Sequence, residues 1–337
     1  MKNNTFNLKG SYSPTNYNLS IYLEELGWKS SAWRRLAKFS VDNLEFNEQA
    51  AQCLEYKHLL ANLVKQYCQS VMPLTYCIND SNWSLILNEL AQQFYVRGQI
   101  LVDEIKDLIW ILKPALLNNG QSIKLFKRLS DLEWHFLNTN RLGGDHVLQY
   151  YIPNPHLLRD RRKYSIRQFI VLTNYAGAYL YHHGYFNVAL TPFNLNNLTN
   201  LNAHLTNEHL NDDNVNVIQI PTDQFTFFPP LFIEIKHILQ KVISALNKTY
   251  PQAFKINKAK PAFALFGVDF MVDDQQKVWL LEANHGPCFP ANDTHPLQQH
   301  LYKPFWRALI KNFVVPIGNQ ELKQPVDKDL FTELKLS

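Results

Sequence analysis

The stretch that decides the fold is FALFGVDFMVDDQQKVWLLEANHGP, residues 263–287. It contains two apolar runs separated by the polar segment VDDQQK, which predicts two strands joined by a turn. Side chains on a strand alternate between its faces, so Glu282 and Asn284 share one face of the second strand. One register of the hairpin sets Asp269 opposite Glu282 on that same face. The stretch therefore predicts two carboxylates and an amide close together on an apolar hairpin.

Two carboxylates at this separation repel each other, and one takes up a proton unless a cation lies between them. A small set of hard oxygen ligands suits Mg²⁺ with bound water and substrate phosphates better than a closed Ca²⁺ or Zn²⁺ site. We therefore expect a magnesium site at Asp269, Glu282 and Asn284. A half-exposed hairpin whose acids face water is the alternative that the hairpin alone leaves open.

Two cationic side chains interrupt apolar runs elsewhere in the chain. Lys113 ends the run WILKP, and Arg167 lies inside YSIRQFIVL. A lysine at a strand end can bind a phosphate as a point charge, although a lysine that extends its ammonium group to solvent has the same pattern. An arginine within a buried strand needs an anionic partner, either a protein carboxylate or a phosphate.

Length and composition limit the class of protein. The chain has 337 residues, of which 46% are hydrophobic, so we expect two or three lobes rather than one small domain. A net charge of +4 does not indicate a nucleic-acid-binding protein, and it would suit an acidic protein partner or a merely solvated surface. The four cysteines form no CxxC pair, which favours free thiols in a reducing compartment. Without a signal peptide or an apolar run of ~18 residues, a soluble cytoplasmic protein with no membrane partner is expected.

The hydrophobic pattern predicts an α+β fold. Helices are expected within residues 1–70, 84–98, 231–248 and 297–315, the last broken near Pro304. Strands are expected at 71–78, at both ends of 107–129, at 146–155, and as two long strands in 162–190. We expect the Asn-rich segment 194–216 to be a mobile surface loop and the tail after Pro316 to be loosely held. Regular βαβ alternation is absent, which favours α+β over a doubly wound sheet.

Five blocks in this order resemble the tubulin–tyrosine ligase family, which has the ATP-grasp fold. The stretch 263–287 is similar to that family's Mg-binding hairpin. WILKP and NNGQSI resemble its second-lysine strand and nucleotide-covering loop, and VLQYYIPNP resembles its adenine-contacting strand. KYSIRQFIVLTN and AHLTN resemble two further blocks. The resemblance extends from about residue 70 to about residue 290.

The resemblance implies an ATP-grasp enzyme with an N-terminal lobe (1–75), a central lobe (76–145), a C-terminal lobe containing the hairpin (146–317) and a tail (318–337). It implies an ATP- and Mg²⁺-dependent ligase that joins a free amino acid to a protein carboxylate through an acyl-phosphate. Tubulin or another acidic protein would be the acceptor, for tyrosination, glutamylation or glycylation. A ligase acting on a small molecule or peptide, and an impaired nucleotide-binding protein, stay open as alternatives. The implied location is the cytoplasm, or a host cytosol if the source is an intracellular bacterium.

The resemblance also assigns roles to individual residues. The metal ligands would be Asp269, Glu282 and Asn284, and the catalytic residues Arg167, Lys113 and Glu282. The nucleotide-binding residues would be Lys57, Lys113, Gln149, Tyr150, Lys163, Thr206 and Asn207, with Lys57 the most loosely aligned.

Four positions depart from the family pattern. Ser165 replaces an aspartate at the ribose position, and Asn187 replaces an arginine near the reacting groups. Ser122 replaces a glycine in the covering loop, and His285 replaces a small residue. The metal end therefore matches the family better than the ribose and acceptor ends, and these departures put the nucleotide affinity and the amino-acid substrate in doubt.

Overall fold

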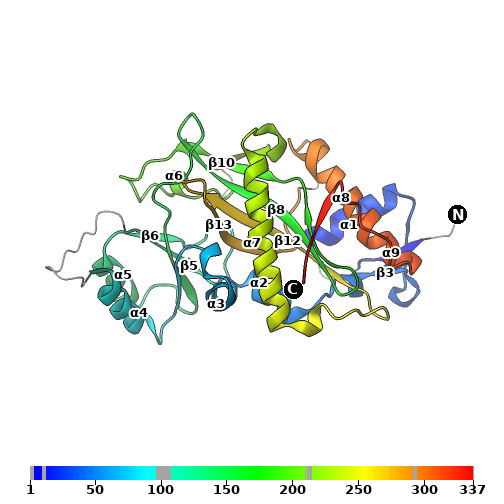
Figure 1. Ribbon diagram of the computed structural model, residues 1–337, viewed down its shortest axis with the longest axis horizontal. Helices are drawn as coiled ribbons and strands as arrows, with labels where there is room; N and C mark the ends of the chain where they lie inside the picture. Colours follow the sequence, from blue (N-terminus) through cyan, green and yellow to red (C-terminus); the bar gives the residue numbers. More distant parts are fainter. Residues whose placement is uncertain are drawn as a thin grey trace.

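The computed structural model describes residues 4–9, 13–95, 108–208, 210, 215–290 and 294–336. Within these ranges, helices mix with three separate sheets, which confirms the predicted α+β class. Figure 1 shows an elongated molecule with a small lobe at one end, a large sheet crossed by one long helix in the middle, and the N-terminal segment beside the last helices at the other end.

The central sheet has seven antiparallel strands. They are β8 (Arg162–Thr173), β9 (Gly177–Tyr181), β10 (Tyr185–Pro192), β11 (Val217–Pro221), β12 (Phe263–Val272), β13 (Val278–His285) and β14 (Phe331–Leu334). The long strand β8 pairs with β12 along one edge, and with β10 and then β9 along the other. This sheet is the frame that connects both ends of the molecule.

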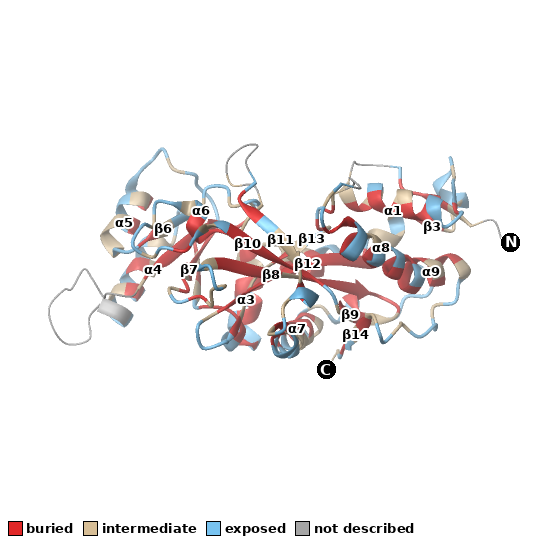
Figure 2. Ribbon diagram, turned by 90° about the horizontal axis from the view of Figure 1, so that it is seen from above, coloured by how far each residue is buried: buried red, intermediate tan, exposed pale blue. Residues whose placement is uncertain are grey.

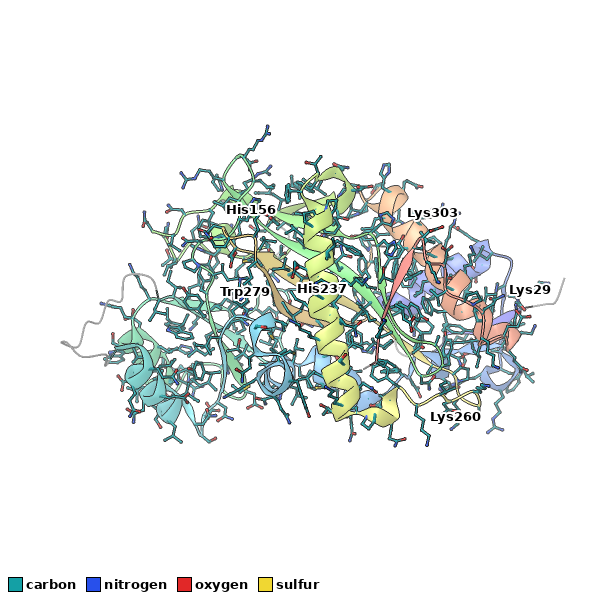
Figure 3. All side chains as sticks on the ribbon, in the orientation of Figure 1. Lys29, His156, His237, Lys260, Trp279 and Lys303 are labelled. Atoms are coloured by element: carbon teal, nitrogen blue, oxygen red, sulfur yellow. The ribbon has the colours of Figure 1, made fainter. Side chains whose placement is uncertain are left out.

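Different helices cover the two faces of the central sheet (Figure 2). On one face, α2 (Glu48–Glu55), α3 (Lys57–Tyr67) and α7 (Phe228–Thr249) form a core with Ile166 and Ile170 of β8. On the other, α1 (Pro14–Glu25) and α8 (Lys303–Leu309) cover Phe169 and Val171. The helix predicted at 231–248 is confirmed as α7, and Figure 3 shows His237 on its outer, solvent-exposed side.

Two smaller sheets flank the central one. An antiparallel sheet in the order β4-β7-β5-β6 is covered by α4 (Trp83–Leu90) and α5 (Leu129–Leu137). Its strands are β4 (Thr75–Ile78), β5 (Trp110–Pro114), β6 (Lys124–Phe126) and β7 (His146–Tyr150). A parallel sheet near the N-terminus consists of β1 (Thr5–Asn7), β2 (Lys29–Ser30) and β3 (Phe39–Ser40). Residues 1–70 are thus not purely helical. The lobe boundaries that the resemblance implies, 1–75, 76–145, 146–317 and 318–337, stay a prediction.

The remaining helical segments are short. They are α6 (Leu201–His204), α9 (Val315–Asn319), π-helical turns at Ala91–Tyr95, Gln298–Tyr302 and Ile310–Val314, and 3₁₀ turns at Arg34–Leu36, Val41–Leu44, Gln69–Val71, Thr222–Gln224 and Pro251–Ala253. None of the helices in the described ranges combines the length and apolar character needed to cross a membrane.

The structure corrects three predictions of local structure. Residues 162–190 form three strands rather than two, because a second turn separates β9 from β10. The last helical segment continues through Pro304, which directly follows the π-helical turn Gln298–Tyr302 and lies at the start of α8. The segment 194–216 contains α6 with Ala203 and His204 buried, while its residues 209 and 211–214 lie outside the described ranges. Residues 96–98 of the helix predicted at 84–98 also lie outside them.

The tail after Pro316 is packed, contrary to the prediction that it is loosely held. Strand β14 pairs with β9 of the central sheet. The ring of Phe331 lies 5.2 Å from the ring centroids of both Tyr181 and Phe313, and Phe331 and Leu334 are buried. Backbone pairing and two buried apolar side chains therefore fix a segment whose sequence alone is too short to indicate a strand.

We predict that Phe331→Ala lowers the free energy of unfolding by about 3–5 kcal/mol, the usual cost of truncating a buried phenylalanine. Chemical denaturation measures this change. Glu333→Ala, an exposed position on the same strand, is the matched control and should cost no more than about 0.5 kcal/mol. Equal small effects of both substitutions would show that the tail does not contribute to the core.

Candidate active site

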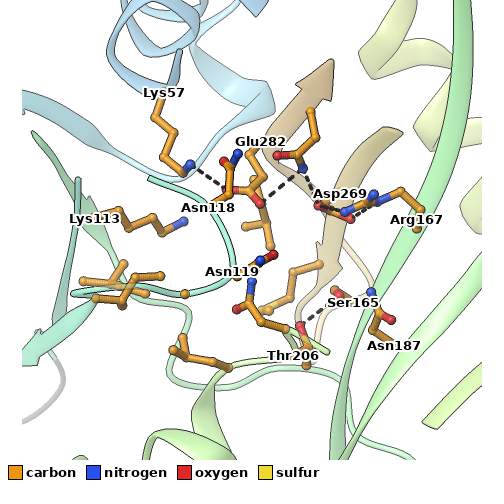
Figure 4. Close-up of a pocket in the computed structure, with 18 of the residues that line it drawn as sticks. Lys57, Lys113, Asn118, Asn119, Ser165, Arg167, Asn187, Thr206, Asp269 and Glu282 are labelled. Atoms are coloured by element: carbon orange, nitrogen blue, oxygen red, sulfur yellow. Dashed lines mark hydrogen bonds and ion pairs between the residues drawn. The ribbon is translucent and has the colours of Figure 1, made fainter. Parts of the chain in front are cut away.

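One cavity of about 360 Å³ lies between the central sheet and the four-stranded sheet (Figure 4). It is lined by all eleven residues that the sequence singled out: Lys57, Lys113, Gln149, Tyr150, Lys163, Arg167, Thr206, Asn207, Asp269, Glu282 and Asn284. Three of the four departing positions, Ser165, Asn187 and His285, also line it. Residues from both sheets and from α3 are thus brought together around one space.

Strand alternation explains how β8 contributes to this cavity. Lys163, Ser165 and Arg167 follow at intervals of two and line the cavity. Farther along the same face, Phe169 and Val171 belong to the core beneath α1 and α8. One face of β8 is therefore polar where it borders the cavity and apolar where helices cover it.

A β-bulge directs Glu282 into the cavity. Asp269 lies opposite Glu282, as predicted, but the next pair is Phe270 with Leu280, so Leu281 is an extra residue on β13. Leu280 is part of the core, whereas Leu281 and Glu282 both line the cavity. Without the extra residue, alternation would place Glu282 on the core face with Leu280. The predicted register is confirmed, and the bulge places the Glu282 side chain in the cavity beside Asp269.

Arg167, Asp269 and Glu282 lie directly opposite one another on three neighbouring strands. Arg167 donates two hydrogen bonds to Asp269, from Nε to Oδ1 at 2.6 Å and from Nη2 to Oδ2 at 2.7 Å. Asn284 Nδ2 donates to Asp269 Oδ2 at 3.2 Å and to Glu282 Oε1 at 3.4 Å (Figure 4). The sequence left either a protein carboxylate or a phosphate as the partner of Arg167. In the structure, Arg167 contacts a protein carboxylate, that of Asp269.

The two carboxylates have different electrostatic surroundings. Lys57 Nζ lies 3.4 Å from Glu282 Oε2 and donates to the carbonyl oxygen of Leu117 at 2.8 Å. Burial raises the pKa of Glu282, but the ammonium groups of Lys57 and Lys113 outweigh it and lower this pKa to about 2. Burial raises the pKa of Asp269, against the opposing effect of Arg167. Glu282 is therefore the more strongly ionised member of the pair.

The candidate metal ligands are two carboxylates and one amide. No group of three His, Cys, Asp or Glu side chains suited to a metal occurs in the described part of the chain. Carboxylate and amide oxygens together with water are nevertheless the donors that Mg²⁺ prefers, and Mg²⁺ is usually held by only one or two protein carboxylates. The side chains at Asp269, Glu282 and Asn284 therefore fit Mg²⁺ by chemical type.

Two further buried lysines line the cavity and bond to neutral groups. Lys113 Nζ donates to Gln149 Oε1 at 2.9 Å, and Lys163 Nζ donates to Tyr151 Oη and to the His204 carbonyl oxygen, each at 2.9 Å. Burial lowers the pKa of Lys113 to about 8 and that of Lys163 to about 7. Neither ammonium group forms a salt bridge with a carboxylate of the described residues, so both suit an anionic ligand.

The loop after β5 borders the same cavity through Asn118, Asn119 and Gly120 (Figure 4). Asn119 has φ 56° and Gly120 has φ 71°. This left-handed conformation favours glycine at position 120, where a Cβ would also lie 2.7 Å from Leu210 Cδ2, the movable end of a side chain. Ser122, where the family has a glycine, is also left-handed with φ 57° and does not line the cavity.

Neutral groups and one carboxylate form the other end of the cavity. Thr206 Oγ1 donates to Ser165 Oγ at 2.8 Å. Gln219 Nε2 donates to Asn187 Oδ1 at 3.2 Å and to Glu208 Oε2 at 3.5 Å. Gln219 and Glu208 are not among the residues that the sequence indicated. The isolated glutamine in the apolar run VIQIP could have indicated Gln219, but Glu208 lies in the segment interpreted as a surface loop.

The comparisons with known proteins all indicate the same family. The model of the "Tubulin-tyrosine ligase family" matches residues 45–227 and 229–323. The chain is 27% identical over 294 residues to "Probable tubulin polyglutamylase TTLL2" of Mus musculus, covering 78% of this chain and 50% of that protein. It is 24% identical over 334 residues to "Probable tubulin--tyrosine ligase PBY1" of Saccharomyces cerevisiae, covering 81% of this chain and 43% of that protein. A probable tubulin–tyrosine ligase of Schizosaccharomyces pombe is 23% identical over 356 residues, covering 90% and 87%.

The chain thus spans half or less of the length of the first two relatives. The two matched ranges contain all eleven residues that the sequence singled out, from Lys57 to Asn284. The family match therefore covers every residue that lines the cavity, and every strand of the two sheets beside it except β14. The chain belongs to the tubulin-tyrosine ligase family, and the resemblance of its ordered motifs to that ATP-grasp family is confirmed.

Proposed function

We propose that this chain is an ATP- and Mg²⁺-dependent ligase that joins a free amino acid to a carboxylate of a protein acceptor. The observation that supports this function best is the convergence of four cationic side chains and two carboxylates in one cavity, at Lys57, Lys113, Lys163, Arg167, Asp269 and Glu282. The names of the relatives, which include tubulin polyglutamylases and "Tubulin glycylase 3C", favour tubulin or another acidic protein as acceptor.

The cationic side chains would bind the nucleotide phosphates. Lys113 and Lys163 are buried and close enough to influence each other's charge, so a polyphosphate between them would relieve their repulsion. Gln149 and Tyr150 would contact the base, with Ile111 supplying an apolar wall. Three further residues would contact the nucleotide. Thr206 and Asn207 would lie at its ribose, and Lys57 would lie at its phosphates.

Ser165 changes the ribose end of this proposed site. A serine hydroxyl can accept hydrogen bonds, but it has no charge and only one oxygen, whereas a carboxylate can accept from two hydroxyls at once. Ser165 already accepts a hydrogen bond from Thr206. We therefore expect the ribose to contribute less to nucleotide affinity here than an aspartate would allow.

Asp269, Glu282 and Asn284 would hold Mg²⁺, which when bound supplies positive charge to the phosphate oxygens. Arg167 is fixed by two hydrogen bonds to Asp269, whose charge outweighs burial and raises the pKa of Arg167. The guanidinium group therefore stays charged at all physiological pH values. A fixed cation at this position would stabilise negative charge that develops during transfer.

The proposed reaction has two steps. An oxygen of the acceptor carboxylate bonds to the γ-phosphorus of ATP, and the bond from that phosphorus to ADP breaks. The amine nitrogen of the amino acid then bonds to the carbonyl carbon of the acyl-phosphate, and inorganic phosphate leaves. The nitrogen, attacking as the neutral amine, loses one of its two protons and keeps the other in the amide. No side chain of the ligase forms a covalent bond with a substrate, so its contribution would be positioning and charge neutralisation.

We predict that Glu282→Gln reduces amino-acid addition by roughly 10²-fold or more, since it removes a charge from the proposed metal site. Mass spectrometry of a eukaryotic lysate incubated with the chain, Mg²⁺–ATP and all amino acids measures the addition. Glu234→Gln, on the exposed side of α7, is the matched control and should retain activity. Undiminished addition by Glu282→Gln would exclude the proposed role. ATP hydrolysis without any modified protein would instead favour a small-molecule acceptor.

We predict that ATP binding takes up protons near pH 8. In the free protein, Lys163 and Lys113 have pKa values of about 7 and about 8, so both are partly neutral there. Bound phosphates favour the charged ammonium forms and raise both pKa values, so affinity falls as pH rises from 7 to 9. Titration calorimetry in two buffers of different ionisation enthalpy measures the uptake. Lys163→Met should reduce it, and the absence of uptake in the unsubstituted chain would place the nucleotide elsewhere.

A further inference from the structure

One row of side chains crosses four strands of the central sheet where the sheet borders the cavity. Tyr185 on β10 lies opposite Arg167 on β8. Arg167 in turn lies opposite Asp269 on β12, and Asp269 lies opposite Glu282 on β13. All four residues line the cavity. The proposed reaction uses Arg167 and the two carboxylates, whereas Tyr185, at the end of the row, has no role in it.

The two ends of this row have different neighbours. Lys57 Nζ lies 3.4 Å from Glu282 Oε2, and Glu282 affects the pKa of Lys113 more strongly than Asp269 does. The lysines proposed to bind the phosphates are therefore at the Glu282 end. Attacking and leaving oxygens lie roughly in line during phosphoryl transfer, so the group that receives the phosphoryl must approach from the other end of the row. Arg167 and Tyr185 lie at that end.

Arg167 has hydrogen-bond donors available for a ligand. Its Nε and Nη2 atoms donate to Asp269, and Nη1 has no hydrogen-bond partner among the described residues. A Cβ at position 267 would lie 2.7 Å from Nη1, so Gly267 leaves the space that this part of the guanidinium group occupies. The two N–H groups of Nη1 can therefore bind an anion in the cavity.

Tyr185 is a neutral hydrogen-bond donor beside this guanidinium group. Burial raises its pKa, against the lowering effect of Arg167, so the hydroxyl keeps its hydrogen at physiological pH. Tyr302 Oη donates to Gln219 Oε1 at 3.1 Å and is also hydrogen-bonded to Tyr185, which holds the phenol in place. The hydrogen of Tyr185 is then available to Tyr302 or to an acceptor in the cavity. An anionic oxygen is the stronger acceptor of the two.

We propose that the hydroxyl of Tyr185 donates a hydrogen bond to the carboxylate of the protein acceptor, beside Arg167. The inference rests on the proposed ligase function. One oxygen of the carboxylate would accept from Arg167 Nη1 and the other from Tyr185, so both oxygens are held while a lone pair attacks the γ-phosphorus of ATP. Tyr185 keeps its proton throughout, so the bonds that form and break are those of the proposed reaction.

The test compares the unsubstituted chain with Tyr185→Phe, which keeps the ring packed against Phe169 and removes only the hydroxyl. The acceptor and the amino acid that mass spectrometry of the lysate reaction identifies are used in purified form with Mg²⁺–ATP. The KM for the acceptor should rise at least tenfold, because a hydrogen bond to a charged group is lost, while the KM for ATP changes less than twofold. Acceptor binding in the presence of Mg²⁺ and a non-hydrolysable ATP analogue should weaken by a similar factor.

Two further variants separate substrate contact from a structural role. Tyr181→Phe is the matched control, because Tyr181 is buried in the same sheet but does not line the cavity, and it should change neither KM more than twofold. Tyr302→Phe removes the hydroxyl that holds Tyr185 and should raise the acceptor KM less than Tyr185→Phe does. Thermal unfolding should show that all three variants are folded.

The outcomes distinguish this inference from the proposed function. An unchanged acceptor KM in Tyr185→Phe, a parallel rise of the KM for ATP, or an equal effect of Tyr302→Phe overturns the role of Tyr185 while the ligase function stands. No added mass from the unsubstituted chain overturns both.

Discussion

Two carboxylates on neighbouring strands must be stabilised by cations if both are to be ionised inside a protein, and this constraint governs the centre of the molecule. Asp269 is held by Arg167 from β8, and Glu282 lies beside Lys57 from α3. The cations therefore come from different parts of the chain, and the carboxylate pair forms only when the central sheet and α3 are assembled. Removing one partner of such a buried pair costs about 3–5 kcal/mol, so stability and the site depend on the same contacts.

The same constraint explains the division of the central sheet. The buried charged residues of the sheet, Lys163 and Asp269, border the cavity, and aromatic and aliphatic side chains occupy the parts beneath α1, α8 and α7. The four-stranded sheet closes the cavity from the opposite side and contributes Lys113, whose ammonium group donates to Gln149. The cavity thus has an anionic pair in the middle, two lysines that donate to neutral groups on one side and Glu208 on the other. Such a gradient of charge orients a ligand that has both anionic and cationic groups.

Local patterns predicted much of this arrangement because strand alternation is a local property. The hairpin register, the shared face of Glu282 and Asn284, and the unusual positions of Lys113 and Arg167 follow from spacing and polarity within short stretches. The bulge at Leu281, the pairing of β14 with β9 and the contact of Gln219 with Glu208 depend on residues distant in the sequence. A β-bulge is an extra residue relative to the partner strand, so the alternation within one strand cannot reveal it. The Asn-rich composition around Glu208 likewise predicted a mobile loop and gave no sign of its buried neighbours.

The packing of α1 against α8 has a consequence for how the chain acquires this structure during synthesis. Tyr22 accepts a hydrogen bond from Gln298, 276 residues away, and its ring stacks against Trp306. At typical elongation rates of 5–20 residues per second, the ribosome needs on the order of tens of seconds to deliver that partner. Helix α1 therefore emerges long before the surface that buries it. Its apolar side chains are a natural target for chaperones that hold nascent chains until the last helices appear.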